Sequence, residues 1–283
     1  MNEEDLDLGE WVGRTQQQSD DVGLAAQQGL WTLLDHEGPG PAAWEDALPL
    51  SHWLCFAPAP RQSEIGEDGH PRRGGFLPSV SLPRRMWAGS DVVFHHPLRV
   101  GDEVTRASRI ERVASKSGRS GALVFVTVRH EITDSRGLAL TETQDIVYRD
   151  APSPSAPPPV AQDAPTGEAF QREITPDPVL LFRYSALTGN GHRIHYDRPY
   201  ATDAEGYPGL VVHGPLIATL LIDLLRSQFP EAYVLRFAFK AVSPLFDIHR
   251  FTVYGRADEA RSFSLWARNH EGKLAMQASA ETA

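Results

Sequence analysis

Apolar residues recur at helical spacing near the start of the chain and are followed by runs of alternating residues. Residues 21–36 carry Val22, Leu30 and Leu33 on one side, which predicts a helix. Alternation between apolar and polar positions is clearest at Val124 and Val126. The strands predicted in this part of the chain are 90–95, 103–113, 122–132 and 139–148, with a hairpin turn at 134–137.

The second part of the chain repeats this order of elements. Residues 177–186 predict a short helix, with Asp177 as its N-cap and Pro178 at the first helical position. Residues 216–229 predict a strongly apolar helix that ends before Pro230. The strands predicted after it are 235–240, 249–256, 262–269 and 274–279, with a hairpin turn at 269–272.

Between the two parts lies a proline-rich segment, residues 151–160, which cannot pack as a regular element. We therefore expect an N-terminal domain over 1–150 and a C-terminal domain over 161–283, joined by this linker. Residues 57–89 depart from a clean repeat because they are rich in Pro, Gly and Arg and open no apolar helix. We expect this segment to shape a substrate pocket without forming a second active site.

Composition narrows the class of protein. A hydrophobic content of 41% and a charged content of 23% are typical of a soluble globular protein. The net charge is −10 and no basic run is present, which argues against a nucleic-acid partner. No apolar window is long enough to span a membrane, and the acidic N-terminus is not a signal peptide. The single cysteine, Cys55, excludes an intrachain disulfide, so we expect a cytoplasmic protein in which Cys55 is a buried apolar residue.

The candidate catalytic residues lie in two segments. One is a histidine-rich loop, residues 188–195, and the other is His213-Gly214-Pro215, at the start of the apolar helix. The free N–H groups at the start of a helix polarise a carbonyl, and a histidine beside them moves protons near neutral pH. Such a pair suits a reaction in which a carbonyl is polarised at the helix end while a proton and a water molecule are moved next to it.

This loop, Thr188-Gly-Asn-Gly-His-Arg-Ile-His195, resembles the hydratase motif of the MaoC-like hot-dog proteins. It is most similar to the branch that includes mesaconyl-C4-CoA hydratases, itaconyl-CoA hydratases and mitochondrial-type hydroxyacyl-thioester dehydratases. The resemblance implies an α+β double hot dog, in which two antiparallel sheets are each wrapped round a central helix.

The resemblance also implies the roles of three residues. His195 matches the catalytic histidine, and Gly214 would present its backbone N–H to the thioester carbonyl. Asn190 stands where the wider family has an aspartate; a neutral amide orients water but does not accept its proton. His195 is therefore the leading general base. For His192 and His213, contact with the substrate and a purely structural role both stay open.

We expect the substrate to carry a carboxylate, for which arginine is the natural partner. The candidates are Arg84 and Arg85, which lie beside Trp87, and Arg193 in the motif. The expected function is hydration of itaconyl-CoA or mesaconyl-C4-CoA to citramalyl-CoA. The alternatives are a 3-hydroxyacyl-thioester dehydratase of fatty-acid synthesis, a thioesterase, and a hot-dog module that binds acyl-CoA without turnover. We expect no metal and no cofactor, an acyl-CoA as the partner molecule, and a homodimer as one assembly open to the chain.

Overall fold

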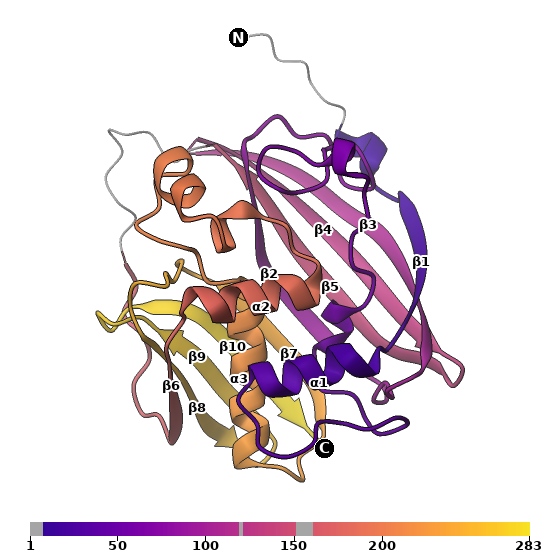
Figure 1. The fold of residues 1–283 in the computed structure, drawn as a ribbon, viewed down its shortest axis with the longest axis vertical. Coiled ribbons are helices and arrows are strands. Elements are labelled where there is room, and N and C mark those ends of the chain that lie inside the picture. The colour runs from indigo at the N-terminus through magenta and orange to yellow at the C-terminus, as the bar shows by residue number, and fades with distance from the viewer. Residues whose placement is uncertain (1–7, 119–120, 151–160) are drawn as a thin grey trace.

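A computed structural model of the protein describes residues 8–118, 121–150 and 161–283; the predicted linker at 151–160 lies outside them. Ten strands form one antiparallel sheet in the order β1-β3-β4-β5-β2-β7-β10-β9-β8-β6 (Figure 1). The strands are β1 (Thr15–Asp21), β2 (Arg84–Phe94), β3 (Glu103–Gly118), β4 (Gly121–Asp134), β5 (Gly137–Arg149), β6 (Phe170–Ile174), β7 (Val234–Ala241), β8 (Phe251–Glu259), β9 (Ser262–Arg268) and β10 (Leu274–Thr282).

The two halves of the sheet have the same topology. The N-terminal half runs β1-β3-β4-β5-β2, and the C-terminal half runs β6-β8-β9-β10-β7, which is the same order displaced by five strands. They meet where β2 pairs antiparallel with β7, from Gly89 opposite Lys240 to Val93 opposite Arg236. The two predicted sheets are therefore joined edge to edge into one, while the predicted α+β class is confirmed.

Helix α3 (Gly214–Gln228) lies across the inner face of the C-terminal half of the sheet, as Figure 1 shows. Its residues from Leu216 to Leu225 are all buried, because the helix carries apolar side chains on nearly every side. Helix α2 (Pro178–Thr188) leads into the motif loop. The Asp177 carboxylate accepts the backbone N–H groups of Val179 and Leu180, which confirms the predicted N-cap.

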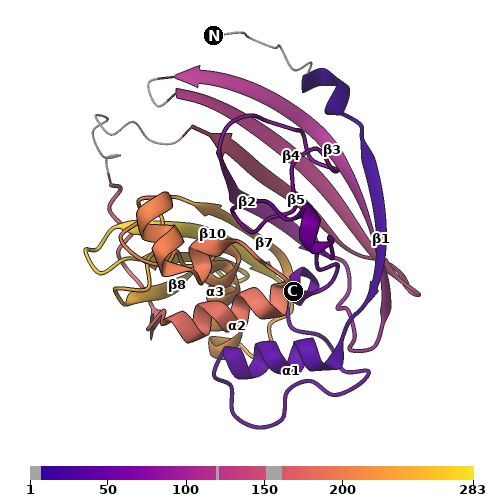
Figure 2. The same cartoon turned by 45° about the horizontal axis from the view of Figure 1, so that its top comes forward.

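No such helix covers the inner face of the N-terminal half among the described residues. Helix α1 (Leu24–Leu33) packs against α2, and the two lie side by side in Figures 1 and 2. The chain between α1 and β2 forms only short 3-10 turns at Ser51–Leu54 and Gln62–Glu64. The expected central helix is thus present in one half alone, since residues 34–83 hold no apolar run long enough to form it.

The strands at the two edges of the sheet, β1 and β6, were not predicted from the sequence. β1 has the sequence TQQQSDD and is exposed on both faces except at Gln18, so it has no apolar alternation to recognise. β2 begins at Arg84, before the predicted residue 90, and so takes Arg84, Arg85 and Trp87 out of the expected loop.

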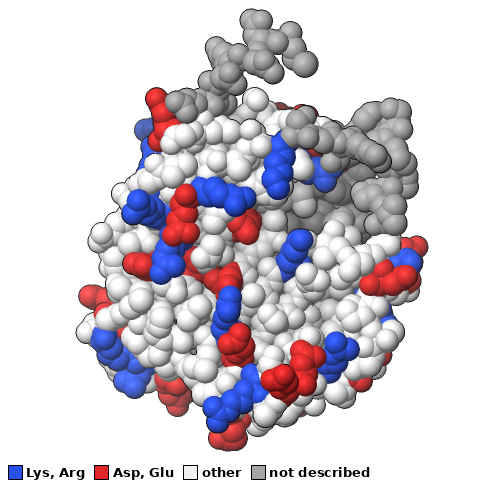
Figure 3. Space-filling model, turned by 180° about the vertical axis from the view of Figure 1, so that it is seen from behind, with Lys and Arg blue, Asp and Glu red and all other residues white. Residues whose placement is uncertain are grey.

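The face of the sheet turned away from α3 carries acidic and basic side chains side by side (Figure 3). No continuous basic surface is visible on this face (Figure 3). Within the described ranges, no helix has the length and hydropathy needed to cross a membrane.

Candidate active site

His195 occupies a short 3-10 turn, Arg193–His195, just after α2, and only 7% of its surface is exposed. Its Nδ1 atom lies 2.7 Å from the Val211 carbonyl oxygen. Because a carbonyl only accepts, Nδ1 carries the proton and donates it to Val211. The Nε2 atom is then left with its lone pair, so the neutral ring can accept a proton there.

The ring of His195 stacks on that of His213, with centroids 3.6 Å apart and planes 17° apart. His213 Nε2 in turn lies 2.8 Å from the Ser185 hydroxyl. His213 is the N-cap of α3, so the next peptide N–H belongs to Gly214. The histidine and the start of the helix, which the sequence analysis paired, therefore lie together.

The space in front of Gly214 is open. A Cβ built on this residue would have no atom within 4 Å. Among the residues described, none accepts a hydrogen bond from the Gly214 N–H, as expected for the first turn of a helix. A ligand carbonyl could approach this N–H and gain from the helix dipole behind it.

Burial keeps the histidines of this cluster neutral. It lowers the pKa of His195 from 6.5 to about 4 and that of His192 to about 2. The pKa of His213 also lies well below its usual value, mainly because of burial and then because of the charge on His195. At pH 7 all three rings are uncharged, which is the form that accepts protons.

These pKa values predict that the protein loses stability as the pH falls from 7 towards 4. The unfolded chain takes up protons near pH 6.5, whereas the folded state resists them, so the stabilisation is complete above pH 6.5 and declines below it. For one such histidine the loss between pH 6.5 and 5 is about 2 kcal/mol. Urea unfolding at pH 7.5 and pH 5 should show a smaller difference for His195→Gln than for the wild type. An equal difference for both proteins would contradict these pKa values.

Asn190 shapes the motif loop. Its side-chain oxygen accepts a hydrogen bond from the backbone N–H of His192 at 3.0 Å. The backbone N–H of Asn190 donates to the Ser185 carbonyl at 2.9 Å. The amide NH₂ group has no protein partner in the described ranges. It is therefore the part of Asn190 that can hold a water or a substrate oxygen.

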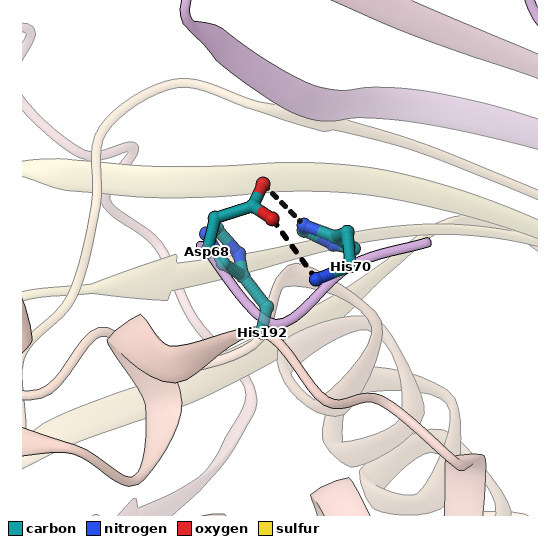
Figure 4. A group of neighbouring side chains, drawn as sticks. All are labelled: Asp68, His70 and His192. Carbon is teal, nitrogen blue, oxygen red and sulfur yellow. Dashed lines mark hydrogen bonds and ion pairs between the residues drawn. The ribbon is translucent and has the colours of Figure 1, made fainter. Parts of the chain in front are cut away.

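The N-terminal half brings two residues that the sequence analysis missed, Asp68 and His70. Figure 4 shows them beside His192, in a turn that follows the 3-10 helix Gln62–Glu64. Asp68 Oδ2 lies 3.0 Å from His70 Nδ1, and the rings of His70 and His192 lie 4.2 Å apart. The only signal in the sequence was that residues 57–89 were expected to line a pocket.

The three arginines predicted to bind the substrate carboxylate differ in what they contact. Arg84 pairs with Glu205 at 3.3 Å, and Arg193 pairs with Asp197 at 2.7 Å, so both guanidinium groups already have a counter-charge. Arg85 has no ion pair with any described residue. Its charge lowers the pKa values of His70 and His192, which places it beside the histidine cluster.

Aromatic side chains fill the inner face of the sheet beyond Arg85. Trp87 lies two residues further along β2, its ring 4.9 Å from that of Trp53 and 6.0 Å from that of Phe239. Behind them Glu142 is buried and accepts hydrogen bonds from Trp53, Ser90 and His52. Burial alone would raise the pKa of Glu142, but the hydrogen bond and charge of His52 and its other partners lower it to about 2. This part of the sheet is therefore closed by packed rings around a buried carboxylate.

The N-terminal half lacks a second copy of the site. The Ala47 N–H donates to Leu98 in that half, as the Val212 N–H donates to Leu245 in the other. Two residues after Ala47 stands Pro49, in the place that Gly214 holds after Val212. A proline has no N–H to donate. A pocket of about 250 Å³ remains at this place, but in the described residues only the short 3-10 turn Ser51–Leu54 begins there, and no α-helix.

Asp68, His70 and His192 offer ligand atoms within 4.8 Å of one another, the kind of set that can hold a metal ion. Both oxygens of Asp68, however, already accept hydrogen bonds from His70. The nearby charge of Arg85 also opposes a cation. The absence of a metal stays a prediction.

A family profile described as hydroxyacyl-thioester dehydratase type 2 matches residues 50–247. Over 271 residues the chain is 46% identical to the mesaconyl-C(4)-CoA hydratase of Chloroflexus aurantiacus, and the match covers 96% of each chain.

Two solved structures are similar in fold. One is a MaoC-like dehydratase from Phytophthora capsici, with a TM-score of 0.70, 14% identity and 96% of each chain covered. The other is a Mycobacterium tuberculosis protein described as a double hotdog, with a TM-score of 0.58, 14% identity and 96% of each chain covered. The predicted double hot-dog fold is confirmed.

Proposed function

This chain belongs to the family of type 2 hydroxyacyl-thioester dehydratases, and we propose that it adds water to a short dicarboxylic enoyl-CoA. The proposed substrates are mesaconyl-C4-CoA and itaconyl-CoA, both hydrated to citramalyl-CoA. The observation that carries the proposal is the stacking of His195 on His213 at the start of α3. It places a neutral proton acceptor beside the free N–H of Gly214. The similarity to the Chloroflexus mesaconyl-C(4)-CoA hydratase supports the substrate class.

In the proposed reaction with mesaconyl-C4-CoA, whose double bond joins the α and β carbons, the thioester carbonyl accepts a hydrogen bond from the Gly214 N–H. Water held near the Asn190 amide gives a proton to His195 Nε2 while its oxygen bonds to the β carbon. The electron pair of the double bond moves towards the carbonyl, and the helix end stabilises the enolate charge that develops there. The Val211 carbonyl holds the His195 ring in the tautomer that this step needs. The partial negative charge on the carbonyl oxygen also stabilises the imidazolium that forms.

The shape of the site favours a short substrate. Trp87, Trp53 and Phe239 contact one another on the face of the sheet that a long acyl chain would have to cross. The guanidinium of Arg85, which has no carboxylate partner among the described residues, lies next to the histidines, where the carboxylate of a dicarboxylic acyl group would arrive. In this arrangement the C-terminal half supplies the reacting groups and the N-terminal half shapes the pocket.

The proposal is tested by following the loss of enoyl-thioester absorbance with four substrates. We expect the highest kcat/KM with mesaconyl-C4-CoA or itaconyl-CoA, less with crotonyl-CoA, and least with a ten-carbon enoyl-CoA. Preference for the ten-carbon substrate would favour the second candidate, a 3-hydroxyacyl-thioester dehydratase of fatty-acid synthesis. Membership in a family of hydroxyacyl-thioester dehydratases is the observation that keeps this candidate. Binding of all four without turnover would leave a module that only holds acyl-CoA.

Arg85→Gln should raise KM for mesaconyl-C4-CoA by about 10- to 100-fold, the loss of one charge-assisted hydrogen bond. Turnover of crotonyl-CoA should hardly change, because that substrate has no carboxylate. Arg84→Gln is the matched control: its partner is Glu205, so any effect should be equal on both substrates. An equal loss with both substrates in Arg85→Gln would mean that Arg85 serves coenzyme A or the fold instead.

A cytoplasmic location belongs to the same proposal, together with a homodimer as one assembly and an acyl-CoA as the only small-molecule partner. We also propose that turnover needs no metal and no cofactor.

A further inference from the structure

A turn of the N-terminal half, residues 66–70, packs directly against the motif loop. The Arg193 N–H donates to the Asp68 carbonyl at 2.9 Å. Gly69 has φ +87°, and a Cβ on it would lie 1.9 Å from the Gly191 carbonyl oxygen. Only glycine permits both this conformation and this approach. The turn is therefore held in a fixed position against the motif.

Within this turn Asp68 orients His70. One carboxylate oxygen lies 3.0 Å from His70 Nδ1 and the other accepts the His70 backbone N–H, also at 3.0 Å (Figure 4). Burial alone would raise the pKa of Asp68, but the hydrogen bonds from His70 hold it below its usual value. An ionised carboxylate on Nδ1 fixes the ring and leaves Nε2 outside the pair.

His70 is linked to the residues of the motif loop through the ring of His192. Its ring centroid lies 4.2 Å from that of His192, and the His192 ring lies 5.5 Å from that of His195. The His192 ring thus contacts both of the other rings, and His70 is near enough to His195 for its charge to lower the pKa of His195. A substrate lying across the motif loop can meet the two histidines at different carbons.

Hydration of an enoyl thioester needs two proton transfers, one from water and one to the α carbon. His195 is neutral and suited to the first, and Asn190 has no acidic proton for the second. We propose that His70, held by Asp68, protonates the α carbon. This inference rests on the proposed hydratase function and names a second acid/base group, which comes from the other half of the chain.

The step balances as follows. Water loses a proton to His195 Nε2 and its oxygen bonds to the β carbon, so the double-bond pair becomes the enolate. The enolate pair then takes a proton from His70 Nε2–H, and the His70 imidazolium becomes neutral. The proton gained by His195 and the one lost by His70 are re-equilibrated with solvent before the next turnover.

Five charged or titratable groups act on or are acted on by His70, namely Asp68, Arg85, Arg73, His192 and His195. Asp68 favours the imidazolium, while Arg85, Arg73 and His192 oppose it or add no charge. Burial lowers the pKa of His70, and the hydrogen bond to Asp68 opposes that lowering. A substrate carboxylate on Arg85 would offset one of the opposing charges. The pKa of His70 stays below its ordinary value, so its proton-donating form is the minor form at pH 7 and becomes scarcer as the pH rises.

The test compares pH profiles of kcat/KM for mesaconyl-C4-CoA hydration. The wild-type value should already be falling as the pH rises through neutrality, approaching about tenfold per pH unit. In His70→Gln the value should drop about 100-fold and lose this dependence. In Asp68→Asn the falling limb should move to lower pH, because the imidazolium has lost its counter-charge. His270→Gln, an exposed histidine on the turn after β9, is the control and should behave as wild type.

Chemical rescue tests the role of His70 without relying on a shift in the pH profile of kcat/KM. Added imidazole should restore turnover to His70→Ala, in proportion to the concentration of its protonated form. Reduced rates with an unmoved pH limb and no rescue would overturn the inference and leave His70 a structural residue. Loss of wild-type activity on chelation, with one bound metal ion per chain, would overturn it in favour of a metal site. If the wild type hydrates no enoyl-CoA, the proposed function is contradicted. If the wild type is active and His70→Gln hydrates the substrate at a normal rate, only the role proposed for His70 is contradicted.

Discussion

His195→Gln is expected to lower kcat for enoyl-CoA hydration by about 10²–10⁴-fold, the usual effect of removing a general acid or base. The reason is local. His195 is the one imidazole of the loop whose Nδ1 is fixed on a backbone carbonyl, leaving Nε2 to take the proton from water. Glutamine keeps a donor for Val211 and much of the volume, so the stack on His213 loses a ring without opening a large cavity.

Circular dichroism and urea unfolding at pH 7.5 should show that this variant remains folded. The matching control is again His270→Gln, which changes an exposed histidine far from the motif loop. A His195→Gln enzyme with nearly normal kcat and an intact fold would move the proton acceptor elsewhere, with His192 the next residue to test.

Gly214→Pro is expected to lower kcat by about 10²–10³-fold, because it removes the one N–H proposed to hold the thioester oxygen. The backbone tolerates the change. Proline is accepted at the first position of a helix, and His213 before it already has ψ 131°, the value that precedes a proline. The N-terminal half carries a proline, Pro49, at the matching place.

Gly214→Ala is the paired variant because it adds a similar Cβ and keeps the N–H. The open space at this position leaves room for that Cβ, so any loss common to both variants measures crowding of the substrate. The extra loss in the proline variant measures the hydrogen bond. Equal rates for the two variants would show that the Gly214 N–H does not contribute to catalysis.

Sequence alone predicted the C-terminal half well. Its helices begin with local signals, a capping aspartate with proline in α2 and His-Gly-Pro in α3, and its strands alternate. The motif loop could be aligned residue by residue, so His195, Asn190 and Gly214 were found without a structure. Their catalytic roles stay predictions.

The N-terminal half was harder because its signals depend on contacts distant in sequence. β1 is entirely polar and pairs through its backbone with β3, so no side-chain pattern marks it. Asp68 and His70 can be recognised as site residues only from the contact of Gly69 with Gly191, which is more than a hundred residues away in the sequence. Which arginine could bind the substrate carboxylate likewise depends on the ion pairs of the folded chain. Arg84 pairs with Glu205 and Arg193 pairs with Asp197, so Arg85 is the candidate without a carboxylate partner.

The most direct test is a crystal structure of the His195→Gln variant with mesaconyl-C4-CoA bound. The thioester oxygen should lie about 3 Å from the Gly214 nitrogen, with the β carbon facing residue 195 and the carboxylate on Arg85. A thioester bound away from the start of α3, or a carboxylate directed into solvent, would contradict the site proposed for this chain.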